Sequence, residues 1–402
     1  MSRTAVEYFE RPEAPDTHFV DNRIYTGEDI FREEQEKIFS RVWKFVCHES
    51  EISNVNDYRT TIVAETPLIV CRGPDGTIRT FVNACSHRGA LVIRNPRGNA
   101  RTLQCIFHRW TYDNASGECT GRPSEPGFTE MGPKIEACGL RQVKTEVYLG
   151  LVFVNLNDGA EGLKDFLSNA LELEEEILGT VELEVFDYYE QVLNTNWKNW
   201  QETNMDLYHE YMHAINRRTS LGERAYYDRN WRIYPRGHAA IERYKVRYDK
   251  QKGWTERSPH LRLPGLDPSE FQLIDIFPDL AVNARGTVVR IDSQTPLSPT
   301  KTLVQYRGLA IKNVSASDRT QQMKDYAALW SPFGRNLPED CLATELQGRA
   351  MGGGTVPYTY WTRQSAGKTH DDLAIRAYYA EWGRLMGRNP ARPYNAAFPG
   401  SG

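Results

Sequence analysis

The chain has 402 residues, and 49 lysines and arginines against 53 aspartates and glutamates give a formal net charge of −4. This charge argues against a protein whose main work is to bind nucleic acid. With 40% hydrophobic and 11% aromatic residues, the composition is that of a folded globular protein, and the length suggests roughly two or three domains. The absence of any run of about 18 apolar residues predicts no membrane span. Seven scattered cysteines and the lack of an apolar leader favour a reducing cytoplasm over a disulfide framework.

In the first half of the chain, a polar arm and a helix precede a series of short strands. Residues 1–20 are polar and contain proline, which predicts an arm, and a helix is expected from near Thr26. From Tyr58 to about Leu156, β-branched runs alternate with turns rich in glycine and proline, such as GPDG. This pattern predicts a small all-β domain.

The second half mixes helices with longer strands. Residues 162–179 and 194–213 have the composition of helices, whereas residues 214–235 and 249–275 are rich in Arg, Gly, Pro and Tyr, which favours loops. Further strands are expected at 184–193, 239–248, 287–294 and 301–312, and helices at 316–331, 338–350 and 371–387. The pattern predicts an α+β fold in which the small all-β domain is set inside a larger domain of sheet and helices.

The most specific motif pairs one cysteine with one histidine twice. One residue lies between Cys85 and His87, two residues lie between Cys105 and His108, and 17 residues separate the two halves. Two thiolates and two imidazoles on opposed loops suit a [2Fe–2S] cluster in which the cysteines hold one iron and the histidines the other. A structural Cys2His2 zinc site is the alternative, but zinc pairs seldom show this alternating order.

A second cluster of polar side chains follows the predicted helical period. Glu202, Asp206, His209 and His213 lie at i, i+4, i+7 and i+11, so a continuous helix would project them on one side. Two histidines four residues apart can bind one metal ion. The letters HEYMH also match the zincin motif, with Glu210 as the base, so a zinc hydrolase is a rival interpretation. The cluster motif upstream argues against that rival, because proteolysis needs no electron relay.

A late acidic residue can complete a metal site. Two histidines and one carboxylate, with open coordination positions, suit non-haem Fe(II) and O₂ chemistry. Asp340 lies near the start of a predicted helix and is the candidate carboxylate. By itself it is more simply an acid in the first helical turn, favoured by the helix dipole.

Taken together, these motifs make the chain resemble the large, α, subunit of the Rieske non-haem iron oxygenases that hydroxylate aromatic rings. The resemblance covers nearly the whole chain, and it rests on IFSRVWKFVCHESEI, YRTTIVAETPLIVCRGPDGTIRTFVN, FHRWTYDNASGE, NWKNWQETNMDLYHEYMH and PEDCLATE. It implies a Rieske domain at 41–157 inserted in a helix-grip catalytic domain at 158–402, with residues 1–40 forming an arm and helix that pack on the catalytic domain.

The resemblance also implies a ligand set for each centre. The two sets are Cys85, His87, Cys105 and His108 for the cluster, and His209, His213 and Asp340 for the mononuclear iron. It further implies that Asp206 links an iron-ligand histidine to a cluster histidine, His108, of a neighbouring subunit. One departure is that only three residues separate His209 from His213, fewer than is usual in the family, so the local turn is expected to differ.

The implied activity is that of the terminal oxygenase component of a multicomponent dioxygenase, which uses O₂ and electrons delivered by a reductase to hydroxylate an aromatic, carboxylated substrate. A monooxygenase acting on a sulfonate or an amine is the alternative. The sequence carries no dinucleotide-binding fingerprint, so electrons from NAD(P)H are expected only through a separate reductase, with or without a ferredoxin. The family is built as trimers, so α3 or α3β3 assembly with a small β subunit is expected. A third interpretation, a bare electron carrier, is disfavoured by the length beyond residue 157.

Candidate substrate contacts carry a weaker signal. Met205 and Tyr208 can line an apolar pocket near the iron, although ordinary packing explains such residues equally well. Arg217, Arg218 and Arg290 can each pair with an anionic substituent through a bidentate fork, although most arginines are simply solvated.

Overall fold

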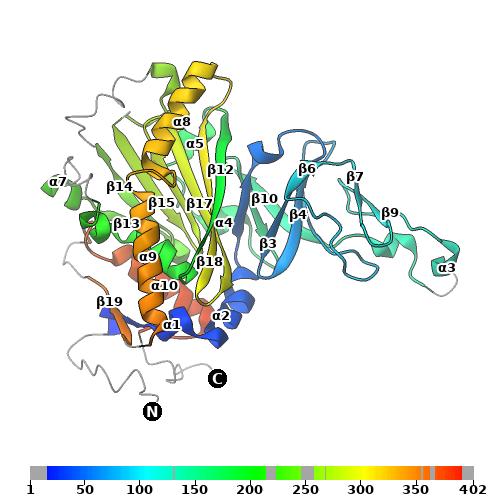
Figure 1. Ribbon diagram of the computed structural model, residues 1–402, viewed down its shortest axis with the longest axis horizontal. Helices are drawn as coiled ribbons and strands as arrows, with labels where there is room; N and C mark the ends of the chain where they lie inside the picture. Colours follow the sequence, from blue (N-terminus) through cyan, green and yellow to red (C-terminus); the bar gives the residue numbers. More distant parts are fainter. Residues whose placement is uncertain are drawn as a thin grey trace, which may run out of the picture. The chain divides into compact units, whose positions relative to one another are not determined.

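The computed structural model describes residues 16–129, 132–213, 223–245, 258–267, 269–354, 356–362 and 367–391. It divides into two compact units (Figure 1), a smaller one at Phe39–Leu163 and a larger one made of Met1–Ile38 with Lys164–Gly402. Most of the predicted N-terminal arm, residues 1–15, lies outside the described residues. No described helix combines the length and the apolar character that a membrane span requires.

The smaller unit is built almost entirely of strands. Its elements are β2 (Lys44–His48), β3 (Asp57–Val63), β4 (Thr66–Arg72), β5 (Ile78–Val82), β6 (Arg97–Asn99), β7 (Thr102–Gln104), β8 (Thr111–Asp113), β9 (Cys119–Gly121), α3 (Pro126–Thr129), β10 (Gln142–Tyr148) and β11 (Leu151–Asn155). Among the described residues, seven strands form an antiparallel sheet in the order β2-β11-β10-β5-β4-β3-β6, and β7-β8-β9 form a second, three-stranded sheet.

Strand β4 explains why this unit has a core on both faces of its large sheet. Leu68 and Val70 point to one apolar cluster, whereas Ile69 and Cys71 point to the other, as the two-residue period of a strand requires. The second cluster also contains residues of the two loops that carry the cysteine–histidine motif. The all-β prediction for this part of the chain therefore holds, and its core supports those loops.

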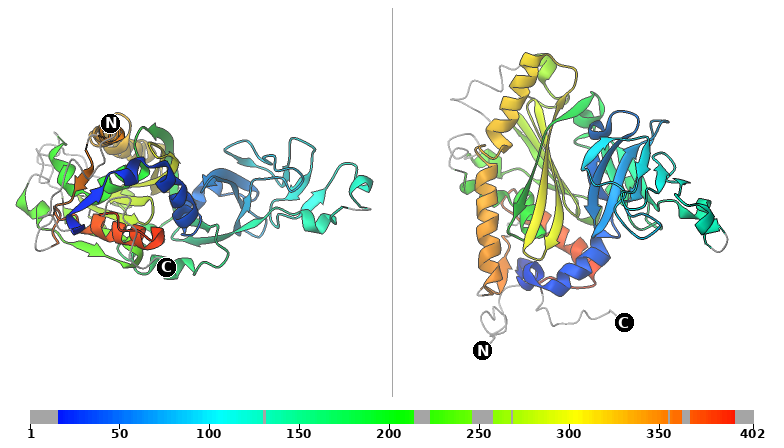
Figure 2. Two further views of the ribbon diagram at one scale, coloured as in Figure 1. Left: turned by 90° about the horizontal axis from the view of Figure 1, so that it is seen from below. Right: turned by 45° about the vertical axis from the view of Figure 1, so that its right-hand side comes forward.

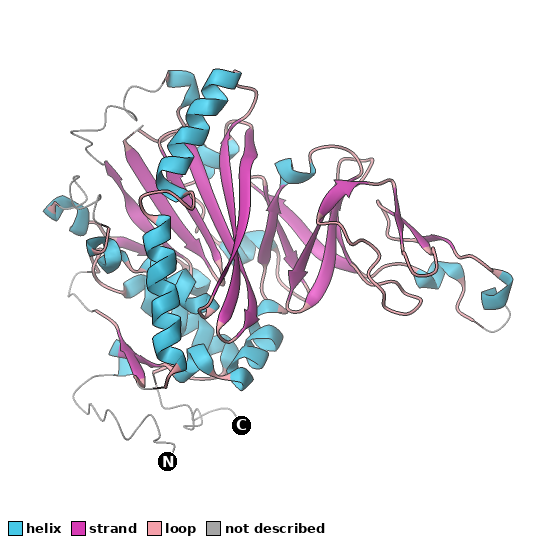
Figure 3. Ribbon diagram, in the orientation of Figure 1, coloured by secondary structure: helices cyan, strands magenta, loops and turns pink. Residues whose placement is uncertain are grey.

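The larger unit contains one long sheet covered by helices (Figure 3). The strands are β12 (Leu183–Leu193), β13 (Trp231–Ile233), β14 (Ala239–Lys245), β15 (Glu270–Ile276), β16 (Leu280–Arg285), β17 (Val288–Ser298) and β18 (Lys301–Ile311). They pair antiparallel in the order β12-β18-β17-β16-β15-β14-β13. A separate antiparallel pair, β1 (Phe19–Asp21) and β19 (Tyr358–Tyr360), joins the start of the described chain to the segment before α10.

The helices of this unit are α1 (Arg23–Thr26), α2 (Glu28–Glu34), α4 (Leu163–Leu167), α5 (Glu175–Gly179), α6 (Trp197–Met205), α7 (Arg224–Tyr227), α8 (Ala316–Trp330), α9 (Leu337–Gly352) and α10 (Leu373–Met386). Helix α6 contacts β15, β16 and β17, α8 contacts β17, and α9 contacts β12 (Figure 2). The helices that carry site residues therefore pack directly on the sheet.

Helix α6 is the central helix of this packing and is held by a buried charge pair. Lys198 Nζ lies 2.6 Å from Glu34 Oε1, and both side chains are fully buried. Trp197 and Trp382 each donate an indole N–H to the same carboxylate at 2.8 Å. A buried ion pair is tolerated only when further hydrogen bonds satisfy it, and these donors do so. The pair fixes α6 between α2 and α10.

Four expectations from the sequence need correction. The predicted helix at 162–179 is two short helices, α4 and α5, because Ser168 adopts a positive φ of 51° between them. The predicted helix at 194–213 ends at Met205, where Asp206 leaves the helical region at φ −104° and ψ 89°. The predicted loop at 249–275 contains strand β15, whose nearly continuous burial hides the alternating pattern of a half-exposed strand. The predicted loop at 214–235 contains helix α7 and strand β13, and strand β16 was not predicted at all.

Candidate metal centre and cluster loops

The turn after α6 positions two histidines. Beyond Met205 the chain forms a 3-10 segment, Leu207–Tyr211, and the Asp206 carboxylate caps it by accepting from Tyr208 N at 2.8 Å. His209 lies within this segment and His213 lies just after it. The two histidines, separated by three residues, are therefore placed by a 3-10 segment rather than by a continuous α-helix.

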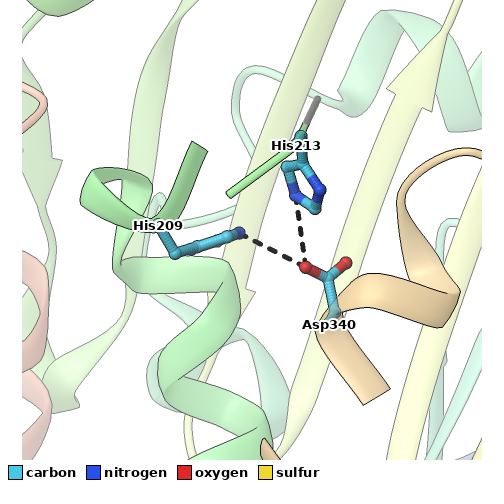
Figure 4. A group of neighbouring side chains, drawn as sticks. All are labelled: His209, His213 and Asp340. Atoms are coloured by element: carbon cyan, nitrogen blue, oxygen red, sulfur yellow. Dashed lines mark ion pairs between the residues drawn. The ribbon is translucent and has the colours of Figure 1, made fainter. Parts of the chain in front are cut away.

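The two imidazoles meet one carboxylate from a distant part of the chain (Figure 4). Asp340 lies in the first turn of α9, and its Oδ1 is 3.6 Å from His209 Nε2 and 3.2 Å from His213 Nε2. One potential ligand atom from each of the three residues lies within 4.8 Å of the others. Two imidazole nitrogens and one carboxylate oxygen on one side of an ion can hold a metal and leave other positions open.

The opposite nitrogen of each imidazole is engaged by the protein. His209 Nδ1 donates to the backbone carbonyl of Asp206, and His213 Nδ1 contacts Glu339 Oε2 at 2.6 Å. Both rings therefore present Nε2 to Asp340. An oxygen acceptor on the far nitrogen is the arrangement that orients metal-binding histidines and raises their basicity. Glu339 was not predicted as part of the site, although its position directly before Asp340 was the available signal.

His213 lies in a strongly anionic environment. Burial disfavours its charged form, but hydrogen bonding and charge from Asp340, together with Glu210 and Glu339, raise the pKa of His213 to about 9. In the protein without a metal this imidazole therefore holds a proton at neutral pH. A metal ion that binds Nε2 must displace that proton, so its binding releases acid.

The predicted quartet of one helical face is only partly brought together. Because α6 ends at Met205, Glu202 turns away from the histidines and accepts hydrogen bonds from Tyr25 at 2.7 Å and from Tyr379. Burial raises the pKa of Glu202 to about 7. Glu202 is therefore part of the packing of α6, whereas Asp206 stays within one turn of His209.

A cavity adjoins the three residues of the candidate metal centre. Its lining, among the described residues, comes from α6, the 3-10 segment, strands β15 to β17 and the ends of α8 and α9: Trp200, Thr203, Asn204, Leu207, His209, Glu210, His213, Phe271, Leu273, Asn283, Arg285, Arg290, Trp330, Asn336 and Asp340. Aromatic and cationic side chains therefore face the candidate metal centre together.

The predicted pocket residues lie elsewhere or play other parts. Met205 is fully buried and Tyr208 is half-exposed against Tyr211, and neither lines this cavity. Met205 and Tyr208 are not neighbours on one helical face, because α6 ends at Met205 and Tyr208 lies in the 3-10 segment. Arg290 does line the cavity, but its guanidinium donates to Asp292 at 2.8 Å and to Asn204 at 2.7 Å. Arg217 and Arg218 lie outside the described residues.

In the smaller unit, the two halves of the cysteine–histidine motif share one backbone geometry. Cys85 N donates to Ala90 O, and Cys85 O accepts from Gly89 N, both at 2.8 Å. In the same way, Cys105 N donates to Trp110 O at 2.9 Å, and Cys105 O accepts from Arg109 N at 3.0 Å. The fourth residue after each cysteine has positive φ, 75° for Gly89 and 60° for Arg109. Each loop therefore folds back over its own cysteine.

The four motif side chains converge between these loops. Both cysteines are buried, and the His87 and His108 rings lie 4.6 Å apart. His87 stacks on Trp110 at 4.9 Å, and its Nδ1 has no hydrogen-bond partner among the described residues. A buried ring nitrogen without a partner is costly unless a ligand binds it. Two buried thiols and two adjacent imidazoles fit a [2Fe–2S] cluster with mixed ligands.

Comparison with known proteins identifies the family of each half of the chain. Residues 42–139 match the Rieske [2Fe–2S] domain, and residues 179–387 match the catalytic domain of ring-hydroxylating alpha subunits. The chain is 58% identical to the 2-aminobenzenesulfonate 2,3-dioxygenase subunit alpha of an Alcaligenes species, over 96% of this chain and 98% of that protein. It is 36% identical to the methanesulfonate monooxygenase hydroxylase subunit alpha of Methylosulfonomonas methylovora, over 98% of both chains.

Solved structures confirm the predicted fold class. The crystal structure of naphthalene 1,2-dioxygenase from a Rhodococcus species, bound to indole, superposes with a TM-score of 0.79 at 23% identity, over 92% of this chain and 94% of that chain. The family matches confirm the predicted enzyme class and its two kinds of iron cofactor, and they give no support to a zinc hydrolase or a bare electron carrier. The chain belongs to the ring-hydroxylating Rieske oxygenases, as the large α subunit of a terminal oxygenase that forms oligomers and takes its electrons from separate proteins.

Proposed function

We propose that the substrate of this oxygenase is an aromatic sulfonate and that the enzyme adds both atoms of O₂ to its ring. The observation that carries this proposal is that two relatives aligned along nearly the full chain are named for sulfonates. The cavity suits such a ligand, because Trp200, Phe271 and Trp330 offer aromatic surface beside arginines. A carboxylated ring, the substrate expected from the sequence, shares the anionic group, but the relatives named for anthranilate and terephthalate are only 26% to 34% identical to this chain.

A second candidate is a monooxygenase acting on a sulfonate. The relative from Methylosulfonomonas methylovora carries that name, but at 36% identity, against 58% for the dioxygenase subunit. The aromatic lining of the cavity favours a ring over a small alkyl sulfonate. Dioxygenation of an aryl sulfonate is therefore the better-supported function.

We propose His209, His213 and Asp340 as the ligands of the mononuclear iron. The convergence of both Nε2 atoms on Asp340 Oδ1, with both Nδ1 atoms held by protein oxygens, supports this set. When bound, Fe(II) supplies the activation of O₂. The protein's part is to fix the two imidazoles, hold the ring in the adjoining cavity and keep water away from it.

We propose Cys85, His87, Cys105 and His108 as the ligands of the Rieske cluster. The repeated loop geometry and the 4.6 Å separation of the two imidazole rings support this assignment. The cluster supplies one-electron transfer when bound. The two cysteines are the buried ligands, so the histidines form the side of the site that an electron partner approaches.

We further propose that Asp206 connects the two kinds of centre between subunits. Its backbone carbonyl holds His209 Nδ1, and its carboxylate organises the turn that carries His209. Asp206 therefore lies within one turn of His209, a proposed iron ligand. The proposal requires a trimer in which His108 of a neighbouring subunit approaches Asp206. We extend it to a small β subunit, an external reductase and a ferredoxin as partners.

The substrate proposal is tested with the α subunit combined with its partner subunits and electron donors under ¹⁸O₂. We expect 2-aminobenzenesulfonate to give a product with two ¹⁸O atoms, and to be consumed faster than anthranilate, its carboxylate analogue. One ¹⁸O atom per product would favour the monooxygenase. Turnover of anthranilate without turnover of the sulfonate would contradict the proposal.

His213→Ala should remove the mononuclear iron and leave the cluster in place. We expect iron content to fall by about one atom per chain, with turnover reduced at least about 100-fold and the cluster spectrum unchanged. His260→Ala is the matched control, because His260 is an exposed histidine that also pairs with a carboxylate, Asp318 at 3.0 Å, outside the cavity. Equal iron content in the two variants would contradict the assigned ligand.

Asp206→Asn keeps the shape of the side chain but removes its charge. We expect both metals to stay bound, while electron transfer from the reduced cluster slows by about 10-fold to 100-fold, the usual effect on activity of losing a residue that supports a metal ligand. Stopped-flow measurement of cluster reoxidation in the presence of substrate and O₂ checks this. Reoxidation at the wild-type rate would show that Asp206 is only a structural cap.

Gly89→Val tests the loop geometry of the cluster site. A Cβ at Gly89 meets no atom within 4 Å, so the φ of +75° is the source of strain, about 1–3 kcal/mol. Gly76, with φ +78° and the same open surroundings, lies in the turn between β4 and β5 and is the matched control. We expect Gly89→Val to lower the ratio of cluster absorbance to protein and Gly76→Val to leave it unchanged. Equal ratios would contradict a special role for this loop.

A further inference from the structure

Arg285 is a cation of the cavity that the sequence did not single out. It lies at the end of β16 and pairs across the sheet with Phe271 of β15. Both side chains line the cavity beside the candidate metal centre, and Arg285 is only 6% exposed. Charged side chains are seldom buried, so a guanidinium in the wall of a cavity is an uncommon feature.

The guanidinium is held against an aromatic ring. Its Cζ lies 5.4 Å from the centroid of the Phe271 ring, within the range of a cation–π interaction. Such stacking fixes the plane of the guanidinium and reduces the freedom that a ligand would otherwise have to remove. Arg285 is therefore arranged beforehand for a planar or forked contact with an anion.

The charge environment of Arg285 favours a bound anion. Burial and the positive charge of Arg335 lower the pKa of Arg285 to about 9, although the negative charge of Glu210 opposes this shift. Arg285 therefore interacts with a second guanidinium and with a carboxylate, and of these two only Glu210 lines the cavity among the described residues. An added anionic group on a ligand would stabilise the charged form of Arg285.

Arg290, the other arginine of the lining, is committed differently. Its guanidinium is bonded to Asp292 at 2.8 Å, and the two side chains are 6% and 1% exposed. Asp292 also accepts from the Trp200 indole at 3.3 Å. Replacing the carboxylate of this network with a ligand would break a buried, hydrogen-bonded pair, which is costly. Arg290 therefore shapes the cavity through its network with Asp292.

We propose that Arg285 binds the anionic substituent of the substrate and thereby selects charged aromatic rings over neutral ones. This inference rests on the proposed function, because it takes the sulfonate as the anion to be bound. Arg285 donates N–H groups to the sulfonate oxygens, and Phe271 and Trp200 offer aromatic surface to the ring. The contact holds the ring in the same cavity that His209, His213 and Asp340 border.

The test compares a charged ligand with a neutral ligand of the same shape. The dissociation constants of 2-aminobenzenesulfonate and 2-aminobenzenesulfonamide are measured by calorimetry under anaerobic conditions, with the metal-loaded oligomer. In Arg285→Gln we expect the sulfonate to bind at least about tenfold more weakly, because a charge-assisted fork is lost. The sulfonamide should change by less than about threefold. Equal weakening of both ligands, or none of either, would overturn the assignment.

Two further variants keep the test decisive. Arg285→Lys retains the charge without the fork, and it should weaken sulfonate binding by an intermediate factor; it also serves if the glutamine variant does not fold. Arg349→Gln removes one charge from an exposed position of α9 outside the cavity, and it should bind both ligands like the wild type. Loss of sulfonate binding in Arg349→Gln would overturn a local role for Arg285.

Wild-type binding separates the two proposals. If the wild-type protein binds the sulfonate and Arg285→Gln binds it equally well, only the assignment of Arg285 is contradicted. If the wild-type protein does not bind the sulfonate, the proposed substrate class is contradicted, and the role of Arg285 falls with it.

Discussion

The convergence of two imidazoles on one carboxylate oxygen is the constraint on which the catalytic unit depends. For both Nε2 atoms to face Asp340, both Nδ1 atoms must be held from behind, and the chain does this with a backbone carbonyl and with Glu339. The carbonyl becomes available because α6 stops at Met205 and the next turn is 3-10. The burial of α6, fixed by Lys198 and Glu34, keeps the end of that helix in place.

The smaller unit positions its candidate cluster ligands with local hydrogen bonds as well as with long-range packing. Each cysteine sits in a loop closed by two backbone hydrogen bonds to residues four and five positions further on. Arg109 accepts a positive φ that glycine would adopt more easily, which indicates that the loop geometry outweighs its conformational cost. Local loops fix the ligands closely while leaving the histidine edge accessible.

The sequence predicted what depends on short spacing and missed what depends on distant pairing. The four cluster residues and the two histidines were recognisable because their spacing reflects local loops. Asp340 could be proposed only because a third ligand was required, and the structure brings it next to the two histidines. The prediction that Glu202 shares a helical face with the two histidines was wrong, because it extended the helix beyond Met205, where the backbone leaves the helical region. Phe271 and Arg285 meet through the register of β15 and β16, two strands that composition does not reveal.

The central claim is that this chain holds two separate iron centres, one for electrons and one for O₂. The most direct measurement is the content of iron, zinc and acid-labile sulfide in freshly purified protein. We expect about three irons and about two sulfides per chain, with no stoichiometric zinc. Zinc in place of iron, or iron without sulfide, would contradict it.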